Sequence, residues 1–127
     1  MPAYLLDTQV VLWMATDPYK LSPAAVDVLA PANRKYVSVA SIWEVAIKYS
    51  KGRSDFIVSS TAFYEMLAYY QIEVLEIDRS QFLEIEKMPF IHKDPFDRLI
   101  IATGIVEEMT LITADQQIQK YPVDWLW

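Results

Sequence analysis

Short, continuously apolar runs alternate along the chain with segments in which apolar residues recur every three or four positions. The apolar runs predict strands at Ala3–Leu6, Tyr36–Val39, Glu73–Ile77, Thr110–Thr113 and Val123–Trp125. The periodic segments predict helices at Thr8–Met14, from Ser22-Pro23, at Ser41–Tyr49, Ser60–Tyr70 and Arg79–Glu86, and from Asp94-Pro95 to about Glu107. Fully apolar strands separated by helices indicate a parallel sheet that is covered on both faces. We therefore predict an α/β fold, a three-layer α/β/α sandwich with a mainly parallel central sheet.

Length and composition limit the chemistry. The 127 residues, 54% of them hydrophobic, are enough for one domain with a real core, and we assign residues 1–127 to it. The chain has no cysteine, one histidine and two glycines, which excludes thiolate metal sites, thiol nucleophiles and glycine-rich phosphate loops. Carboxylates, lysines, arginines and hydroxyls remain as candidate functional groups.

The balance of charge is acidic, with 17 Asp and Glu against 11 Lys and Arg, a net charge of −6. Such a chain binds nucleic acid only through a local basic patch or bound cations. No apolar run approaches the roughly 20 residues of a membrane helix, and Asp7 interrupts the apolar start, which lacks a basic leader. We expect a cytoplasmic protein without a membrane segment.

Four acidic residues occur where predicted strands end or helices begin. Asp7 and Asp115 directly follow strands, Glu44 falls in the first turn of the helix after the second strand, and Asp97 falls in the first turn of the Asp94 helix. Ligands of open parallel sheets collect beyond the carboxyl ends of the strands. We expect Asp7, Glu44 and Asp115 at one edge, with Asp97 joining them if its helix starts there.

Each of these acids also has a purely structural interpretation. Asp7 and Asp115 suit helix N-caps, Ser41 and Glu44 match a capping box, and Asp97 suits the positive end of a helix dipole. The apolar neighbours of Asp7, Glu44 and Asp97 argue against solvated caps. Four carboxylates at one edge would repel one another unless a cation lay among them, and oxygen-rich sites of this kind suit Mg²⁺ or Mn²⁺. Such ions assist phosphodiester hydrolysis.

Several segments resemble a known family. They are LLDTQVVLW (Leu5–Trp13), VSVASIWEVAIK (Val37–Lys48), HKDPFDRLIIATGI (His92–Ile105), LITAD (Leu111–Asp115) and the closing WLW. In order and spacing they resemble the PIN-domain toxins, of the VapC type, of bacterial toxin–antitoxin systems. The run DPFDRLIIA is the most specific of them, and the segments together span nearly the whole chain.

The resemblance implies a Mg²⁺- or Mn²⁺-dependent endoribonuclease that forms a homodimer and is neutralised by a cognate antitoxin. The family's four acids fall on Asp7, Glu44, Asp97 and Asp115. Asp7 and Asp97 are expected to bind the metal directly, and Glu44 and Asp115 directly or through water while orienting the attacking water. Thr113 corresponds to the family's hydroxyl near the metal, although it is equally well an ordinary threonine at a strand end.

One choice and two departures accompany this match. Asp94, followed by Pro95, fits an N-cap with proline at the first helical position, so we choose Asp97 over Asp94 as the third acid. Gln9 stands where this subgroup often has histidine, and Lys93 where arginine is common. Because lysine lacks the two-pronged phosphate contact of arginine, these departures bear on RNA specificity more than on the reaction.

Basic and aromatic residues are the candidates for contacts with RNA and with a partner protein. The candidate phosphate contacts are Lys48, Lys51, Arg53, His92, Lys93 and Arg98, each of which is equally well an ordinary surface charge. Ser60–Tyr70 has more apolar and aromatic residues than one helical stripe needs. Most of them are expected in the core, and the excess is a candidate groove for an antitoxin helix.

Two other functions stay open. The chain could be a non-catalytic acidic α/β module that binds a protein through exposed aromatics, with the acids acting only as caps. It could also be a PIN-type nuclease that cuts structured DNA, although the sequence has no insertion or clamp for such a substrate. A haloacid-type phosphatase is disfavoured because the second aspartate that it requires is replaced here by Gln9.

Overall fold

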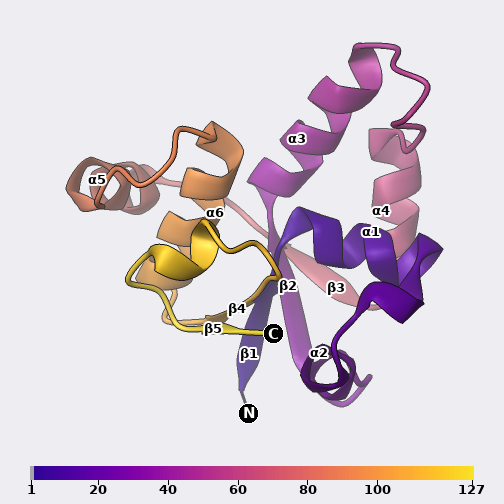
Figure 1. Ribbon diagram of the computed structural model, residues 1–127, viewed down its shortest axis with the longest axis horizontal. Coiled ribbons are helices and arrows are strands. Elements are labelled where there is room, and N and C mark those ends of the chain that lie inside the picture. Colours follow the sequence, from indigo (N-terminus) through magenta and orange to yellow (C-terminus); the bar gives the residue numbers. More distant parts are fainter. Residues whose placement is uncertain (1) are drawn as a thin grey trace.

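The computed structural model describes residues 2–127 and contains a five-stranded sheet with the order β3-β2-β1-β4-β5. Its strands are β1 (Ala3–Leu6), β2 (Arg34–Ser38), β3 (Ile72–Leu75), β4 (Thr110–Ile112) and β5 (Trp125–Leu126). All neighbouring strands are parallel, as predicted. From the central β1 the chain builds the sheet outward through β2 and β3, and then returns to the other side of β1 for β4 and β5. The strand order therefore reverses between β1 and β4 (Figure 1).

Helices cover both faces of the sheet. They are α1 (Thr8–Thr16), α2 (Pro23–Val28), α3 (Val39–Ser50), α4 (Ser60–Tyr69), α5 (Arg79–Lys87) and α6 (Pro95–Val106), with 3₁₀ turns η1 (Pro18–Lys20) and η2 (Ile118–Lys120). Helices α1, α2 and α4 lie to one side in Figure 1, and α5, α6 and η2 lie to the other. The predicted three-layer α/β/α sandwich is confirmed.

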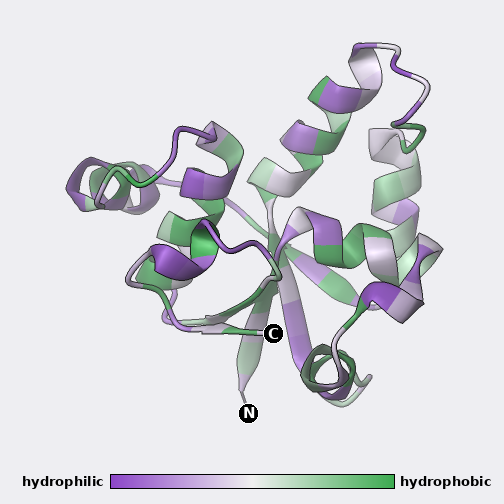
Figure 2. Ribbon diagram, in the orientation of Figure 1, coloured by the Kyte–Doolittle hydropathy of each residue, from purple (hydrophilic) through white to green (hydrophobic). Residues whose placement is uncertain are grey.

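The strand pattern explains the two layers of core. Successive side chains of a strand point to opposite faces of the sheet. Leu6 and Ile112 therefore pack with α1, α2 and α4, whereas Leu5 and Leu111 pack with α6 and η2. Figure 2 shows hydrophobic residues running through the central strands β1 and β4, which are buried from both sides. This rigid centre carries the loops in which the candidate site lies.

The start of α3 differs from the sequence prediction. Ser38 ends β2 and caps α3, its hydroxyl accepting a hydrogen bond of 3.0 Å from the N–H of Ala40. The helix thus begins at Val39, which was predicted to be strand, and the capping box proposed for Ser41 is wrong. Ser41 is buried inside the helix and accepts a hydrogen bond of 2.7 Å from the Thr8 hydroxyl. Glu44 consequently lies in the second turn of α3 rather than the first.

The start of α6 agrees with the prediction. Asp94 is the N-cap, its Oδ1 accepting a 2.9 Å hydrogen bond from the N–H of Asp97, and Pro95 occupies the first helical position. The last strand was misplaced, since β5 begins only at Trp125, where the predicted strand ends. Within residues 2–127, no helix has the length and apolarity needed to cross a membrane.

Candidate active site

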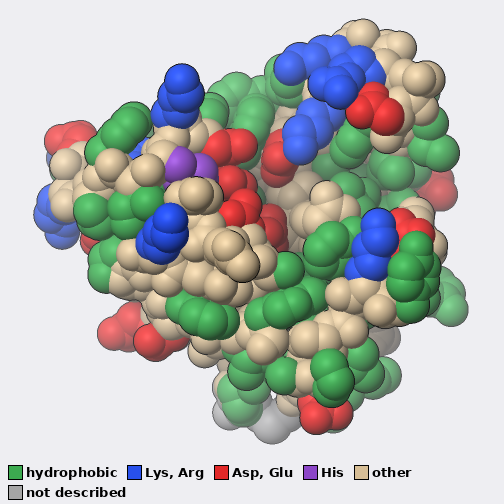
Figure 3. Space-filling model, viewed as in Figure 1, with side chains coloured by type: hydrophobic (Ala, Val, Ile, Leu, Met, Phe, Trp, Pro, Cys, Tyr) green, Lys and Arg blue, Asp and Glu red, His purple; other side chains and the backbone are tan. Residues whose placement is uncertain are grey.

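A cavity of about 330 Å³ opens at the carboxyl ends of the strands, next to the point where the strand order reverses. Its lining includes all four predicted acids, Asp7, Glu44, Asp97 and Asp115, together with Asp94. We call it the acidic cavity. Figure 3 shows the red acidic side chains gathered in a hollow of this face, with blue basic side chains on one side of it. The fold therefore brings together acids from four separate segments of the chain.

Asp7 is buried, with 7% of its surface exposed. It occupies the N-cap position of α1, but its side chain makes no capping hydrogen bond, so the capping interpretation is wrong for this residue. Its Oδ2 instead accepts a 2.8 Å hydrogen bond from the Thr113 hydroxyl. Burial raises the pKa of Asp7 to about 7; the Thr113 hydrogen bond opposes the rise, and the charges of the other three acids add to it.

Glu44 points from α3 into the same cavity and is 6% exposed. Its Oε2 pairs with Lys48 Nζ at 2.9 Å, one helical turn further on. Burial lowers the pKa of Lys48, but the hydrogen bond and charge of Glu44 outweigh it and raise that pKa overall. Glu44 Oε1 is buried and has no hydrogen-bond partner among residues 2–127. A buried, unpartnered carboxylate oxygen is costly, and a bound cation would relieve it.

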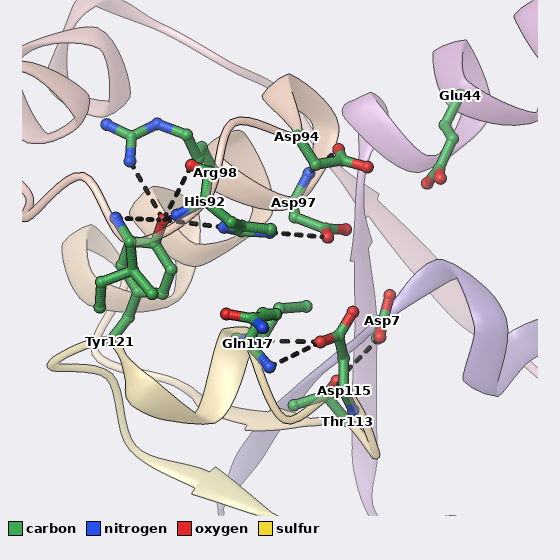
Figure 4. A network of polar contacts seen from close by, with 12 residues as sticks. Asp7, Glu44, His92, Asp94, Asp97, Arg98, Thr113, Asp115, Gln117 and Tyr121 are labelled. Atoms are coloured by element: carbon green, nitrogen blue, oxygen red, sulfur yellow. Dashed lines mark hydrogen bonds and ion pairs between the residues drawn. The ribbon is translucent and has the colours of Figure 1, made fainter.

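Asp97 receives a contact from the single histidine. His92 Nε2 lies 3.0 Å from Asp97 Oδ2, and the ring's Nδ1 lies 2.9 Å from the Tyr121 hydroxyl (Figure 4). Burial raises the pKa of Asp97 to about 6, against the opposing hydrogen bond from His92. Burial lowers the pKa of His92, but the hydrogen bond to Asp97 and the charge of that carboxylate contribute to a net rise.

Asp115 and Thr113 complete the edge at β4. Asp115 Oδ1 accepts hydrogen bonds from the N–H groups of Gln117 (2.8 Å) and Ile118 (3.4 Å). This carboxylate therefore binds nearby backbone N–H groups, as a cap does, and it also lines the cavity. The fully buried Thr113 accepts a 3.0 Å hydrogen bond from the N–H of Asp115 and donates one to Asp7. Its hydroxyl thus connects two of the four acids.

Basic side chains form a second hollow beside the acidic cavity. This basic hollow, of about 250 Å³, is lined by Lys48, Lys51, Arg53, Asp55 and Phe56. Lys48 and Phe56 line both hollows, so the two are adjacent. Arg53 makes a two-pronged contact with Asp55, with both side chains largely exposed. Exposed pairs of this kind are weak, which leaves the guanidinium available to an incoming anion.

Arg98 is not a surface residue, and its predicted role as a phosphate contact is wrong. It is 9% exposed, and its guanidinium donates to the carbonyls of Pro89 (3.1 Å) and Ile85 (3.3 Å) and to the Tyr121 hydroxyl (3.1 Å). Lys93 is exposed next to His92, but neither belongs to the lining of the acidic cavity. The sequence around Arg98 could not reveal this burial, because the same pattern of neighbours fits a buried and an exposed arginine.

Two groups of aromatics need separate comment. On α4, Phe63 and Leu67 are buried in the core, while Tyr64 and Tyr69 are 50% and 81% exposed, so the predicted division between core and excess is observed. Tyr121, which sequence reasoning missed, is 3% exposed and contacts His92 and Arg98. Tyr121 stands between Lys120 and Pro122, and the sequence around it carries no motif that would have identified this role.

The donors in the acidic cavity suit a hard divalent cation. They are carboxylate and hydroxyl oxygens, which Mg²⁺ and Mn²⁺ prefer. The unpartnered Glu44 Oε1 and the raised pKa values of Asp7 and Asp97 are both features that a cation would relieve. No three histidine, aspartate or glutamate side chains of residues 2–127 are already arranged to hold a metal ion. The acids therefore share a cavity without forming a closed coordination shell, as expected of mutually repelling charges.

Comparison with known proteins gives a family match and several similar structures. The model of the PIN domain family matches residues 4–124. Ribonuclease VapC22 of Mycobacterium tuberculosis is 28% identical over 122 residues, which cover 95% of this chain and 93% of that protein. VapBC2 from Rickettsia felis, solved bound to a DNA fragment from its promoter, gives a TM-score of 0.72 at 15% identity and covers 98% and 97% of the two chains. A toxin–antitoxin complex from Klebsiella pneumoniae gives a TM-score of 0.65 at 16% identity, covering 98% and 96%. At these identities the solved structures establish the fold.

Proposed function

This chain belongs to the PIN domain family, and on that premise we propose that it is a divalent-metal-dependent endoribonuclease, the toxin of a toxin–antitoxin pair. The observation that carries the proposal is the buried, unpartnered Glu44 Oε1 in a cavity shared with Asp7, Asp97 and Asp115. Acids that served only as caps would be satisfied by backbone N–H groups, and Glu44 is not. The resemblance to Ribonuclease VapC22 supports ribonuclease activity rather than another phosphodiesterase reaction.

The proposed roles of the four acids are those that the family resemblance implies. Asp7 and Asp97 would hold the cation directly, and Glu44 and Asp115 directly or through water. A Mg²⁺ or Mn²⁺ ion in this place supplies the positive charge that activates water and stabilises an in-line attack on phosphorus. Thr113 holds one oxygen of Asp7 through its 2.8 Å hydrogen bond. The ion pair with Lys48 holds Oε2 of Glu44 in the same way and leaves Oε1 without a partner among residues 2–127.

RNA would cross the acidic cavity and continue over the basic hollow. Lys48 lies between the two, and Lys51 and Arg53 line the outer part. Cations at this place would attract the phosphates on one side of the scissile bond despite the acidic net charge. Lys93, exposed beside His92, is a candidate contact on the other side.

A cognate antitoxin is the proposed protein partner. The acidic cavity would attract a basic side chain of such a partner. The exposed Tyr64 and Tyr69 on α4, both on the helix predicted to offer a groove, are the candidate contacts for an antitoxin helix. A homodimer and a cytoplasmic location belong to the same proposal. The homodimer rests on the family resemblance and not on any contact in this chain.

The deciding experiment is Mn²⁺ binding by calorimetry, with cleavage of a mixed RNA pool on the same samples. Wild type is compared with Asp7→Asn and Asp97→Asn, and with Asp124→Asn, which removes an exposed carboxylate outside the cavity. We expect binding and RNA cleavage to be lost in the first two variants only. Absence of Mn²⁺ binding in the wild type would overturn the proposal and leave an acidic protein-binding module. Cleavage of structured DNA but not RNA would change the substrate class.

A further inference from the structure

His92, the single histidine of the chain, is held between two side chains of different character. Its Nε2 lies 3.0 Å from Asp97 Oδ2, and its Nδ1 lies 2.9 Å from Tyr121 Oη. Figure 4 shows Tyr121, His92 and Asp97 in a row that leads from the segment after η2 to the acidic cavity. Because the neutral imidazole has one donor and one acceptor nitrogen, its neighbours decide which nitrogen faces Asp97 as a donor.

The hydrogen bonds around Tyr121 Oη settle which role Nδ1 has. Oη accepts from the N–H of Ile91 (3.3 Å), from the N–H of His92 (3.1 Å) and from Arg98 Nη1 (3.1 Å). All three groups can only donate, and the guanidinium keeps its charge at any ordinary pH. A phenolic oxygen has two lone pairs, and three donors already share them. Tyr121 therefore cannot accept from Nδ1 as well, and only its hydrogen is left to offer.

The nearest acceptor for that hydrogen is His92 Nδ1 at 2.9 Å, since the alternative, the His92 carbonyl, lies at 3.3 Å. A neutral ring that accepts at Nδ1 carries its hydrogen on Nε2, where it donates to Asp97. We propose that Tyr121 is a positioning residue that holds His92 in the Nε2–H tautomer, so that His92 binds Asp97 Oδ2 and leaves Oδ1 for the acidic cavity.

Arg98 in turn holds Tyr121 in position. Its guanidinium is fixed by the carbonyls of Pro89 and Ile85 and in turn donates to Tyr121. On Asp97, Oδ2 is taken by His92, while Oδ1 has no hydrogen-bond partner among residues 2–127. The tautomer itself is independent of the proposed nuclease function. Its consequence for metal binding rests on that function, because a ligand oriented by an outer partner binds a metal more tightly.

The tautomer is measured by NMR of protein labelled with ¹⁵N-histidine. The chain's single histidine gives one pair of ring nitrogen signals, whose shifts distinguish a protonated from an unprotonated nitrogen in the neutral ring at about pH 9. We expect the wild type to carry its hydrogen on Nε2, where the ionised Asp97 carboxylate accepts it. Tyr121→Phe removes the hydrogen-bond donor of the unprotonated Nδ1, so the Nδ1 signal should shift downfield. Tyr70→Phe is the matched control, because it removes a tyrosine hydroxyl that donates to the Met14 carbonyl in the other core layer. A wild-type hydrogen on Nδ1, or an Nδ1 signal that is the same in Tyr121→Phe as in the wild type, would overturn the proposal.

Metal binding tests whether the effect reaches Asp97. Relative to Tyr70→Phe, Tyr121→Phe should bind Mn²⁺ about tenfold more weakly by calorimetry. In a His92→Gln background, where an amide N–H replaces the ring donor, adding Tyr121→Phe should cause no further loss, because Tyr121 acts only through His92. An equal further loss in that background contradicts the proposal. If the wild type neither binds Mn²⁺ nor cleaves RNA, the proposed function fails, and the nitrogen signals still decide the role of Tyr121.

Discussion

The Thr113 hydroxyl donates a 2.8 Å hydrogen bond to Asp7 Oδ2, although the two residues are 106 positions apart in the chain. Thr113 follows β4 and Asp7 follows β1, and these strands pair directly in the middle of the sheet. The same hydroxyl accepts from the N–H of Asp115. One buried oxygen therefore connects the carboxylate of Asp7 to the backbone of Asp115, and both residues line the acidic cavity.

Thr113→Val tests this connection, since valine has the same shape without the hydroxyl. We expect a loss of about 1–2 kcal/mol in the free energy of unfolding, because the N–H of Asp115 loses its acceptor. Asp7 loses the one hydrogen bond that lowers its pKa, and Mn²⁺ affinity should fall about tenfold. Urea unfolding and calorimetry measure the two effects. Thr113→Ser keeps the hydroxyl and should restore metal affinity; failure of serine to do so argues against the hydrogen bond.

Asp97→Asn and Asp94→Ala separate a site residue from a cap. Asp97→Asn should reduce cleavage at least about 100-fold, beyond the loss typical of an outer-sphere partner, without lowering thermal stability. The charge of Asp94 raises the pKa of Asp97, and removing either charge relieves that repulsion. Asp94→Ala nevertheless loses the cap of α6 and should cost about 1 kcal/mol of stability, whereas Asp94→Ser should not. A clear loss of stability in Asp97→Asn would favour a structural role for this acid.

The burial of Asp7 predicts how the metal-free protein responds to pH. The pKa of Asp7 is raised from 3.8 to about 7, so the folded state holds a proton that the unfolded state has released between these values. By linkage, the contribution of Asp7 to the free energy of unfolding falls as pH rises through this interval and stays low above it.

Asp7→Asn keeps an oxygen for Thr113 and removes this dependence. It should be roughly 2–4 kcal/mol more stable than the wild type at about pH 8, with a difference near zero at about pH 4. Urea unfolding at the two pH values, without divalent metal, gives the comparison. A difference that is the same at both values would mean that the carboxylate is not protonated in the folded protein.

Arg98 and Lys93 should respond in opposite ways. Arg98→Met leaves the carbonyls of Pro89 and Ile85 without their charged donor and should destabilise the fold by about 2–4 kcal/mol. Lys93→Gln, at an exposed position, should leave stability unchanged and weaken binding of RNA. Thermal unfolding and RNA binding by fluorescence anisotropy are measured on the same samples. If Arg98→Met were as stable as the wild type, Arg98 would again be a candidate for binding RNA phosphates at the surface.

The basic hollow is tested through the salt dependence of RNA binding. In an Asp97→Asn background, which prevents cleavage, Lys51→Gln should weaken RNA binding and reduce the slope of log affinity against log salt by about 0.7. Lys120→Gln, an exposed lysine outside both hollows, is the control. Equal effects of the two substitutions would show that only net charge matters.

The sequence by itself determined most elements of the fold and where most of the four acids lie relative to the sheet. A fully apolar run such as Ala3–Leu6 indicates a strand of a sheet that is covered on both faces, and that strand has the predicted bounds. Parallel strands align their carboxyl ends, so Asp7 and Asp115 had to meet at one edge. The start of α6 at Asp94-Pro95 was also predictable from the sequence, because a helix cap depends only on residues that lie within a few positions of one another.

Only the tertiary structure decided which polar groups face one another. Ser38 rather than Ser41 caps α3, and Ser41 lies inside the helix, where its hydroxyl accepts a hydrogen bond from Thr8 of α1. Arg98 is buried and Tyr121 connects it to His92, contacts that cross 23 and 29 positions of the chain. A helical or strand period reports which side of an element is apolar, but hydrogen-bond partners depend on how elements pack. That packing brings together distant segments of the chain, and the local sequence of one segment does not show which other segment it will contact.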